Sequence, residues 1–133
     1  MDIKEIKQYI HDIQRLRDMA ESFTDDSPGA LVRKVELLTQ AHTLMGRVSA
    51  YMSGRHMQTY NLRKRVYAET MRDTTERNKK VAAELAVLDI RDTEAEDFER
   101  MHLWKNEFKS LAEHLYELRM RLRVDMHIGG GSA

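Results

Sequence analysis

The stretch FERMHLWKNEFKSLAEHLYELRMRL, residues 98–122, decides the fold class. Its large apolar side chains recur at intervals of three and four residues, the spacing that places side chains on one face of an α-helix. The pattern persists for about three heptads, which indicates a coiled-coil-like seam. We expect this seam to meet another helix or subunit through Phe98, Met101, Trp104, Phe108, Leu111, Leu115, Leu118 and Leu122.

The ends of this helix are predicted from its charges. Asp92 or Thr93 can cap its start, and the acidic residues Glu94, Glu96 and Asp97 follow directly. Arginines gather near its far end, at residues 119–123. A helix dipole favours this order of charges, so we expect a helix from about residue 92 to residue 126.

Two more helical segments precede it. Isoleucines at helical spacing predict an amphipathic helix over residues 2–23. The boundary follows at residues 24–28, where Ser27 can cap a new helix and Pro28 can occupy its first position. Helical patterning then continues to residue 88 with a polar interval at residues 72–80, so residues 28–88 form either one helix or two.

The composition agrees with an all-α fold. The chain has 133 residues, of which 41% are hydrophobic and 33% charged, with a single proline. We predict a bundle of three to four long amphipathic helices with coiled-coil-like packing, forming a single helical domain over residues 1–128. The sequence GGGSA, residues 129–133, predicts a flexible Gly/Ser tail or a linker.

Composition also narrows the classes of function. The chain has no cysteine, which excludes disulfides and thiolate sites and favours a cytoplasmic location. No stretch approaches the roughly 20 apolar residues of a membrane span, so we expect no membrane partner. The formal net charge is zero, so overall charge gives no reason to expect nucleic-acid binding.

We find no pattern typical of an enzyme and expect neither catalytic residues nor a cofactor. Glu99 and His102 form an E-x-x-H pair of the kind used in di-iron bundles, but no second pair accompanies them, so we expect no metal site either. A metal-dependent bundle enzyme using this pair is the minor alternative. His42 lies among apolar positions and is expected to be a packed, hydrogen-bonded residue rather than a ligand or a base.

Local charge is uneven along the chain. Residues 55–80 carry eight Lys or Arg against three Asp or Glu, whereas residues 84–99 carry seven acidic residues against one arginine. The basic stretch could contact phosphates through Arg63, Lys64, Arg65 and Arg72, with nearby tyrosines as stacking surfaces. We favour the alternative that acidic side chains of a neighbouring helix or subunit neutralise the positive charge of residues 55–80.

Residues 60–123 contain Tyr67-Ala68-Glu69, Glu76-Arg77, Trp104-Lys105-Asn106, Ser110-Leu111-Ala112-Glu113 and the closing run Leu118-Arg119-Met120-Arg121-Leu122-Arg123. This region resembles small helical proteins of bacteriophage early regions, encoded near replication and recombination genes. The resemblance implies a viral accessory protein that acts by binding in the host cytoplasm.

The sequence therefore predicts a non-enzymatic, helical protein–protein interaction module that binds a host or viral protein and also forms a homo-oligomer through its last helix. The alternative is a DNA- or RNA-binding accessory factor in phage replication or recombination that uses residues 55–80.

Overall fold

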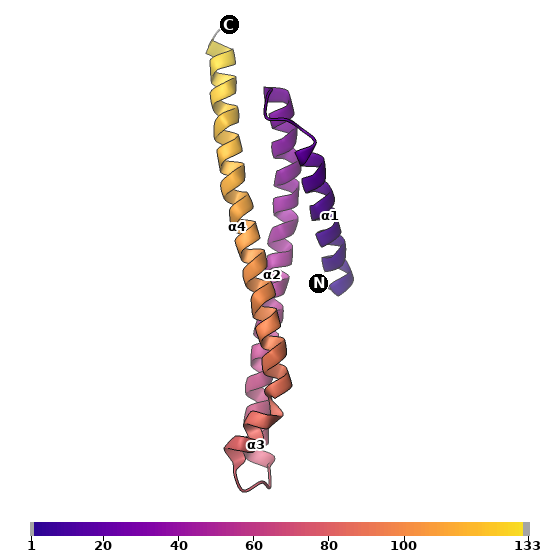
Figure 1. The fold of residues 1–133 in the computed structure, drawn as a ribbon, viewed down its shortest axis with the longest axis vertical. Coiled ribbons are helices and arrows are strands. Elements are labelled where there is room, and N and C mark those ends of the chain that lie inside the picture. The colour runs from indigo at the N-terminus through magenta and orange to yellow at the C-terminus, as the bar shows by residue number, and fades with distance from the viewer. Residues whose placement is uncertain (1, 132–133) are drawn as a thin grey trace. The chain divides into compact units, whose positions relative to one another are not determined.

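The structure of the chain, a computed structural model, describes residues 2–131 and the side chains of residues 2–125. Within these residues the secondary structure consists of four α-helices and contains no strand. The helices are α1 (Ile3–Glu21), α2 (Pro28–Asp73), α3 (Lys79–Ala86) and α4 (Leu88–Gly131), as Figure 1 shows. The all-α prediction is therefore confirmed, and no described helix is both long and apolar enough to cross a membrane.

Side-chain caps begin three of the helices. Asp2 caps α1, where its carboxylate accepts a hydrogen bond from the Glu5 backbone N–H at 3.0 Å. The predicted boundary at Ser27 is confirmed, because its hydroxyl accepts from the Ala30 N–H at 3.2 Å and α2 begins at the next residue. Asn78 caps α3 in the same way. Each cap satisfies an N–H that the first turn of a helix leaves unpaired.

The open question over residues 28–88 resolves into two helices. α2 runs without interruption through Gly54 to Asp73. The chain leaves the helix at residues 74–78, inside the polar interval, and α3 follows as a helix of 8 residues.

The predicted start of the last helix at Asp92 or Thr93 is wrong. α4 begins at Leu88, and the Thr93 hydroxyl donates to the Asp89 carbonyl oxygen inside the helix instead of capping it. Val87, with φ −107° and ψ 5°, separates α3 from α4. Neither glycine nor proline lies between residues 79 and 128, so nothing in the sequence delays the new helix until an acidic cap.

The chain forms two compact units. Unit 1 comprises Met1–Ser49 and Trp104–Ala133, and unit 2 comprises Ala50–Leu103, so α2 and α4 each contribute to both. The expectation of a single domain over residues 1–128 stays a prediction. So does the tail predicted at residues 129–133, of which residues 132 and 133 lie outside the described part of the chain.

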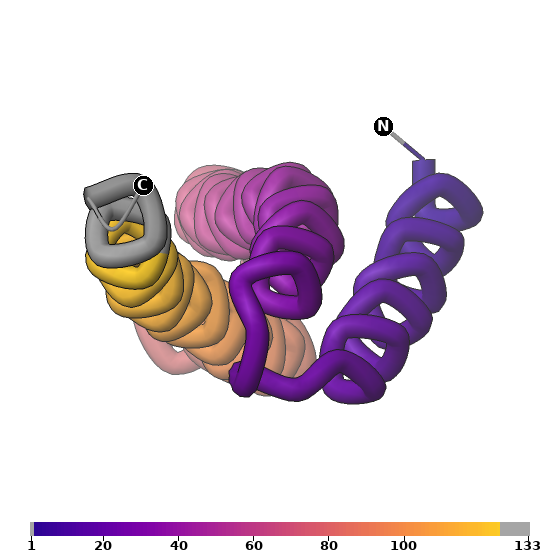
Figure 2. The backbone as a smooth tube through the Cα atoms, turned by 90° about the horizontal axis from the view of Figure 1, so that it is seen from above, coloured from indigo at the N-terminus to yellow at the C-terminus, as the bar shows by residue number. Residues whose placement is uncertain are grey.

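Unit 1 has a continuous apolar core. α1 lies beside the first half of α2 in Figures 1 and 2, and Arg17 reaches from α1 to Glu107 of α4 at 3.5 Å. All three helices supply side chains of this core that are buried, which makes unit 1 a three-helix assembly. They are Ile6, Ile13, Leu16, Ala20, Leu31, Leu37, Leu38, Ala41, Met45, Val48, Leu111, Leu115 and Leu118.

Unit 2 is built differently. The second half of α2 runs antiparallel to the first part of α4: Thr59 meets Asp97, and four residues later Arg63 meets Glu94. Among the described residues of this unit, only Thr59, Asp97 and two residues at α3, Ala83 and Val87, are buried. Unit 2 is thus a helical hairpin with a short third helix and a very small core.

Candidate functional site

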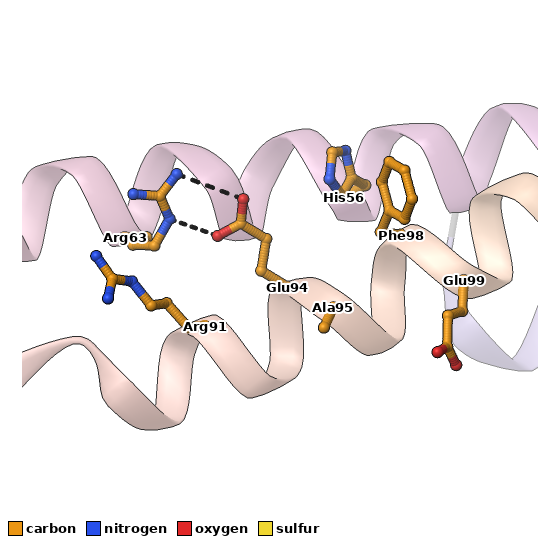
Figure 3. Close-up of a pocket in the computed structure, with 7 residues that line it drawn as sticks. All are labelled: His56, Arg63, Arg91, Glu94, Ala95, Phe98 and Glu99. Carbon is orange, nitrogen blue, oxygen red and sulfur yellow. Dashed lines mark hydrogen bonds and ion pairs between the residues drawn. The ribbon is translucent and has the colours of Figure 1, made fainter.

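The groove along one side of the unit 2 hairpin is the main candidate site (Figure 3). It encloses about 660 Å³ and is lined by His56, Arg63, Arg91, Glu94, Ala95, Phe98 and Glu99. Two of these residues come from α2 and five from α4, so the antiparallel pairing of the helices creates it. The groove is charged where Arg63 and Arg91 lie and aromatic where His56 and Phe98 lie (Figure 3).

The charged part of the groove is held by a two-point ion pair. Arg63 donates from Nε and Nη2 to the two carboxylate oxygens of Glu94, at 2.5 and 3.5 Å. This hydrogen bonding raises the pKa of the Arg63 guanidinium above its usual value. Both side chains are less than a quarter exposed. Such a bidentate pair fixes the geometry of the two helices as well as their charge.

The aromatic part is centred on Phe98. Its ring lies 5.5 Å from the ring of His56 and 4.3 Å from that of His102, measured between ring centres. Phe98 nevertheless remains 48% exposed. A large ring that is braced by two neighbours but still open to solvent is typical of an anchor residue in a protein interface.

A second groove is lined by a different set of residues of the hairpin. It encloses about 360 Å³, and its apolar lining comes from Leu62 and Ile90. Arg55, Gln58, Thr59, Asp89 and Thr93 complete it. Neither groove is roofed by a third long helix of unit 2.

The predicted seam residues divide into two groups. Leu111, Leu115 and Leu118 are buried in unit 1, so the chain itself already covers their surface. Phe98 is exposed, and Met101, Trp104, Phe108 and Leu122 are half-buried. Only this second group offers apolar surface to a partner, and the interface assigned to it stays a prediction.

Three of the four residues predicted to contact nucleic acid form ion pairs with acidic side chains of the same chain. Besides the pairing of Arg63 with Glu94, Arg65 lies 3.9 Å from Glu69, and Arg72 lies 2.8 Å from Asp73. The Arg72 guanidinium donates hydrogen bonds to both Asp73 carboxylate oxygens, and this contact raises the pKa of Arg72.

Tyr60 modifies the same part of α2. The Lys64 ammonium lies 4.8 Å from the centre of the Tyr60 ring, and the Arg63 guanidinium lies 5.3 Å from it. The Tyr60 ring, one of the predicted stacking surfaces for a base, therefore already makes cation–π contacts with two basic side chains. Of the acidic partners, only Glu94 comes from a neighbouring helix as expected, whereas Glu69 and Asp73 lie on α2 itself.

The histidines considered for chemistry have structural contacts. His42 stacks on Phe108 at 4.0 Å, and its Nε2 lies 3.1 Å from the Phe108 carbonyl oxygen, which requires Nε2 to carry the proton. His42 is thus a packed, hydrogen-bonded residue, as predicted. Glu99 lines the first groove and His102 contacts Phe98. Among the described residues, no group of three or more His, Asp or Glu side chains is placed to hold a metal ion.

Sequence reasoning missed the buried contact between Thr59 and Asp97. The Thr59 hydroxyl donates to the Asp97 carboxylate at 2.6 Å, and both residues are buried. The charge pattern predicts Asp97 in the first turns of the last helix. A signal was available, because Asp97 lies seven residues before Trp104 and therefore on the apolar face of the same helix.

No family model, curated protein or solved structure matches this chain.

Proposed function

We propose that the chain is a non-enzymatic protein–protein interaction module that binds its partner through unit 2. The observation that carries the proposal is an imbalance within this unit. Only four of its described residues are buried, and two of those are polar. Seven large apolar side chains are exposed: Met57, Leu62, Val81, Leu85, Leu88, Phe98 and Leu103.

The physical argument is that a two-helix hairpin leaves apolar surface which a further helix can cover. Burial of apolar surface is favourable by about 25 cal/mol per Å², so each of these side chains would gain from a partner. An amphipathic helix laid along a groove is a common way to cover such a surface. The groove around Phe98 has the required form, with an aromatic anchor beside a charged end.

The proposal also includes a homo-oligomer of this chain and a host or viral protein as the partner. The half-buried seam residues Met101, Trp104, Phe108 and Leu122 are candidate contacts for a homo-oligomer through α4. The resemblance to phage early-region proteins supports a host or viral protein as the partner. The proposed place of action is the cytoplasm, the host cytoplasm if the chain is phage-encoded.

Nucleic-acid binding is the less supported alternative. Arg63, Arg65 and Arg72 each lie within 4 Å of a carboxylate of the same chain. To bind phosphates, these side chains would have to give up or share those pairs, which reduces the net gain from counterion release.

Site-specific photo-crosslinking tests the proposal. A photoreactive phenylalanine analogue at position 98, in cells that make the chain naturally, should yield an adduct of one defined mass that is a protein. The matched control places the same group at Glu113, an exposed position of α4 in unit 1. Identical adducts at both positions, or no protein adduct at position 98, would contradict the proposal.

A further inference from the structure

The outward face of α3 and the first part of α4 forms a second surface, which shares only Glu99 with the Phe98 groove. It consists of Val81, Leu85, Leu88, Asp92, Glu99 and Leu103, all exposed, which we call the outer stripe. Consecutive members are separated by four, three, four, seven and four residues. Val81 and Leu85 therefore share one face of α3, and Leu88, Asp92, Glu99 and Leu103 share one face of α4.

The stripe faces away from the small core of unit 2. Successive residues of a helix are about 100° apart, which puts Val81 and Leu85 within about 40° of each other on α3, and Leu88 follows as the first residue of α4. By the same geometry, the buried residues Ala83 and Val87 lie on the opposite side of α3. Val87 separates the two helices, and α4 begins directly after it, with the Arg91 N–H donating to the Val87 carbonyl oxygen at 2.9 Å.

The apolar members of the stripe are unusually open. Val81 is 51% exposed, Leu85 63%, Leu88 50% and Leu103 56%. Leucines and valines with this exposure are unremarkable when they are isolated, but Val81, Leu85 and Leu88 lie within one stretch of eight residues and form a patch. Patches of this kind mark sites where another protein binds.

The charge of the stripe selects the partner. Asp92 and Glu99 lie on the stripe, and Asp89 and Glu96 flank it, all exposed. Arg91 lies 2.6 Å from Glu84, and Arg100 pairs with Glu96 and Asp97, whereas no ion pair of the described residues includes Asp92 or Glu99. A surface that is apolar and acidic complements one that is apolar and basic.

Two other occupants fit this charge less well. A second copy that paired stripe against stripe would bring carboxylates of the two chains together, which is unfavourable. An anionic membrane surface would be repelled by the same carboxylates.

We propose that the outer stripe binds a basic amphipathic helix of another protein, with leucine-like side chains over Val81, Leu85 and Leu88 and lysines or arginines opposite Asp92 and Glu99. This inference rests on the proposed interaction function and adds to it the chemical class of the partner.

Fluorescence anisotropy with two synthetic helical peptides tests the proposal. Both peptides carry leucine at the same positions of one face, with lysine on the flanks of the first and glutamate on the flanks of the second. The lysine peptide should bind the full chain and the glutamate peptide should not. The double variant Leu85→Ser/Leu88→Ser should weaken binding at least about tenfold, as expected when central apolar anchors are lost.

The control variant is Val124→Ser, which removes a side chain that is 53% exposed on α4 in unit 1 and should leave the affinity unchanged. The double variant Asp92→Asn/Glu99→Gln should weaken binding several-fold and reduce its dependence on salt. Circular dichroism should show an unchanged helical content for all variants, because the substituted side chains are exposed.

Three results would overturn the proposal: equal affinity for both peptides, an equal effect of the Leu85/Leu88 and Val124 substitutions, or self-association of the unmodified chain that the Leu85/Leu88 variant abolishes. A protein adduct at position 98 together with any of these results would retain the interaction function and reject only this surface.

Discussion

The Thr59 hydroxyl donates a hydrogen bond of 2.6 Å to the Asp97 carboxylate, which joins α2 to α4 inside unit 2. The Asp97 side chain is only 6% exposed. Its ion pair with Arg100 is longer than the Thr59 hydrogen bond, at 3.5 Å. A buried carboxylate is costly unless it is hydrogen-bonded, so this contact favours the observed register of the two helices over registers that separate the pair.

Replacement of Thr59 by valine should therefore destabilise the protein by about 1–3 kcal/mol, because it leaves the Asp97 carboxylate without its shortest hydrogen bond. Urea denaturation followed by circular dichroism measures the change. Thr93→Val is the control, since the Thr93 hydroxyl is exposed and bonds only within α4. An equal loss in both variants would show that the contact does not hold the helices together.

Replacement of Leu115 by alanine should cost about 2–5 kcal/mol, since its side chain is 1% exposed and its removal leaves a cavity in the core of unit 1. Tyr116→Ala, at the neighbouring position that is 67% exposed, should change the unfolding free energy by less than about 0.5 kcal/mol. Thermal denaturation of the two variants compares them directly. Similar midpoints would mean that α4 does not pack in unit 1 as described.

The two glycines inside α2 should respond differently to alanine. A Cβ at Gly54 would meet no atom within 4 Å, so Gly54→Ala should stabilise the helix by about 0.5–1 kcal/mol through helix propensity. A Cβ at Gly46 would lie 3.1 Å from Cε2 of Phe108, whose ring is also stacked on His42. Gly46→Ala should thus be less stabilising than Gly54→Ala or destabilising, as thermal midpoints would show. A larger gain at Gly46 than at Gly54 would contradict the close packing of α2 on Phe108.

Asp25 should make stability depend on pH at the acidic end. Lys34 and Arg121, each 3.0 Å from this carboxylate, hold its pKa below the ordinary value of 3.8. A lowered pKa in the folded state stabilises the protein above pH 4, and this contribution is lost as the pH falls through the folded pKa.

The variant Asp25→Asn tests this contribution. It should lose a modest amount of stability at pH 7, less than about 1 kcal/mol for partly exposed pairs, and approach the unmodified protein in stability below pH 3. Denaturation curves recorded between pH 2 and pH 7 measure this. A difference between the two proteins that stays constant over the range would show that the carboxylate charge plays no part.

Substitution of Arg63, Lys64, Arg65 and Arg72 together by glutamine should have little effect on nucleic-acid binding, because we expect negligible binding by the unmodified chain at physiological salt. Gel-shift or anisotropy measurements with single-stranded and duplex DNA test this. Tight binding that the four substitutions abolish, with the helical content intact, would instead support the nucleic-acid alternative.

The periodic apolar pattern was enough to predict the fold class, because α1 and α4 repeat their apolar residues at helical spacing and Ser27-Pro28 is a strong local boundary. It could not predict where α4 begins. Acidic residues at the start of a helix and acidic residues along an exposed helical face look the same in the sequence. The contact of Asp97 with Thr59 depends on the pairing of α2 with α4, which the sequence pattern does not give.

The candidate site was predicted only in part. Phe98 was identified from the seam, but leucines of the same seam turned inward, because α1 and α2 supply a complementary face that periodicity on one helix does not reveal. The outer stripe was missed for a related reason. Val81, Leu85 and Leu88 have the spacing of a core face, and only the burial of Ala83 and Val87 shows that they lie on the opposite side.

Native mass spectrometry of the chain isolated at low salt from cells that make it naturally tests the central claim most directly. The account predicts a species heavier than the 15.6 kDa of the chain, which contains a second protein. Leu85→Ser/Leu88→Ser/Phe98→Ser should lose that protein while keeping its helical circular dichroism. A species of 15.6 kDa alone, or one whose additional mass is nucleic acid, would contradict the claim that unit 2 binds a partner protein.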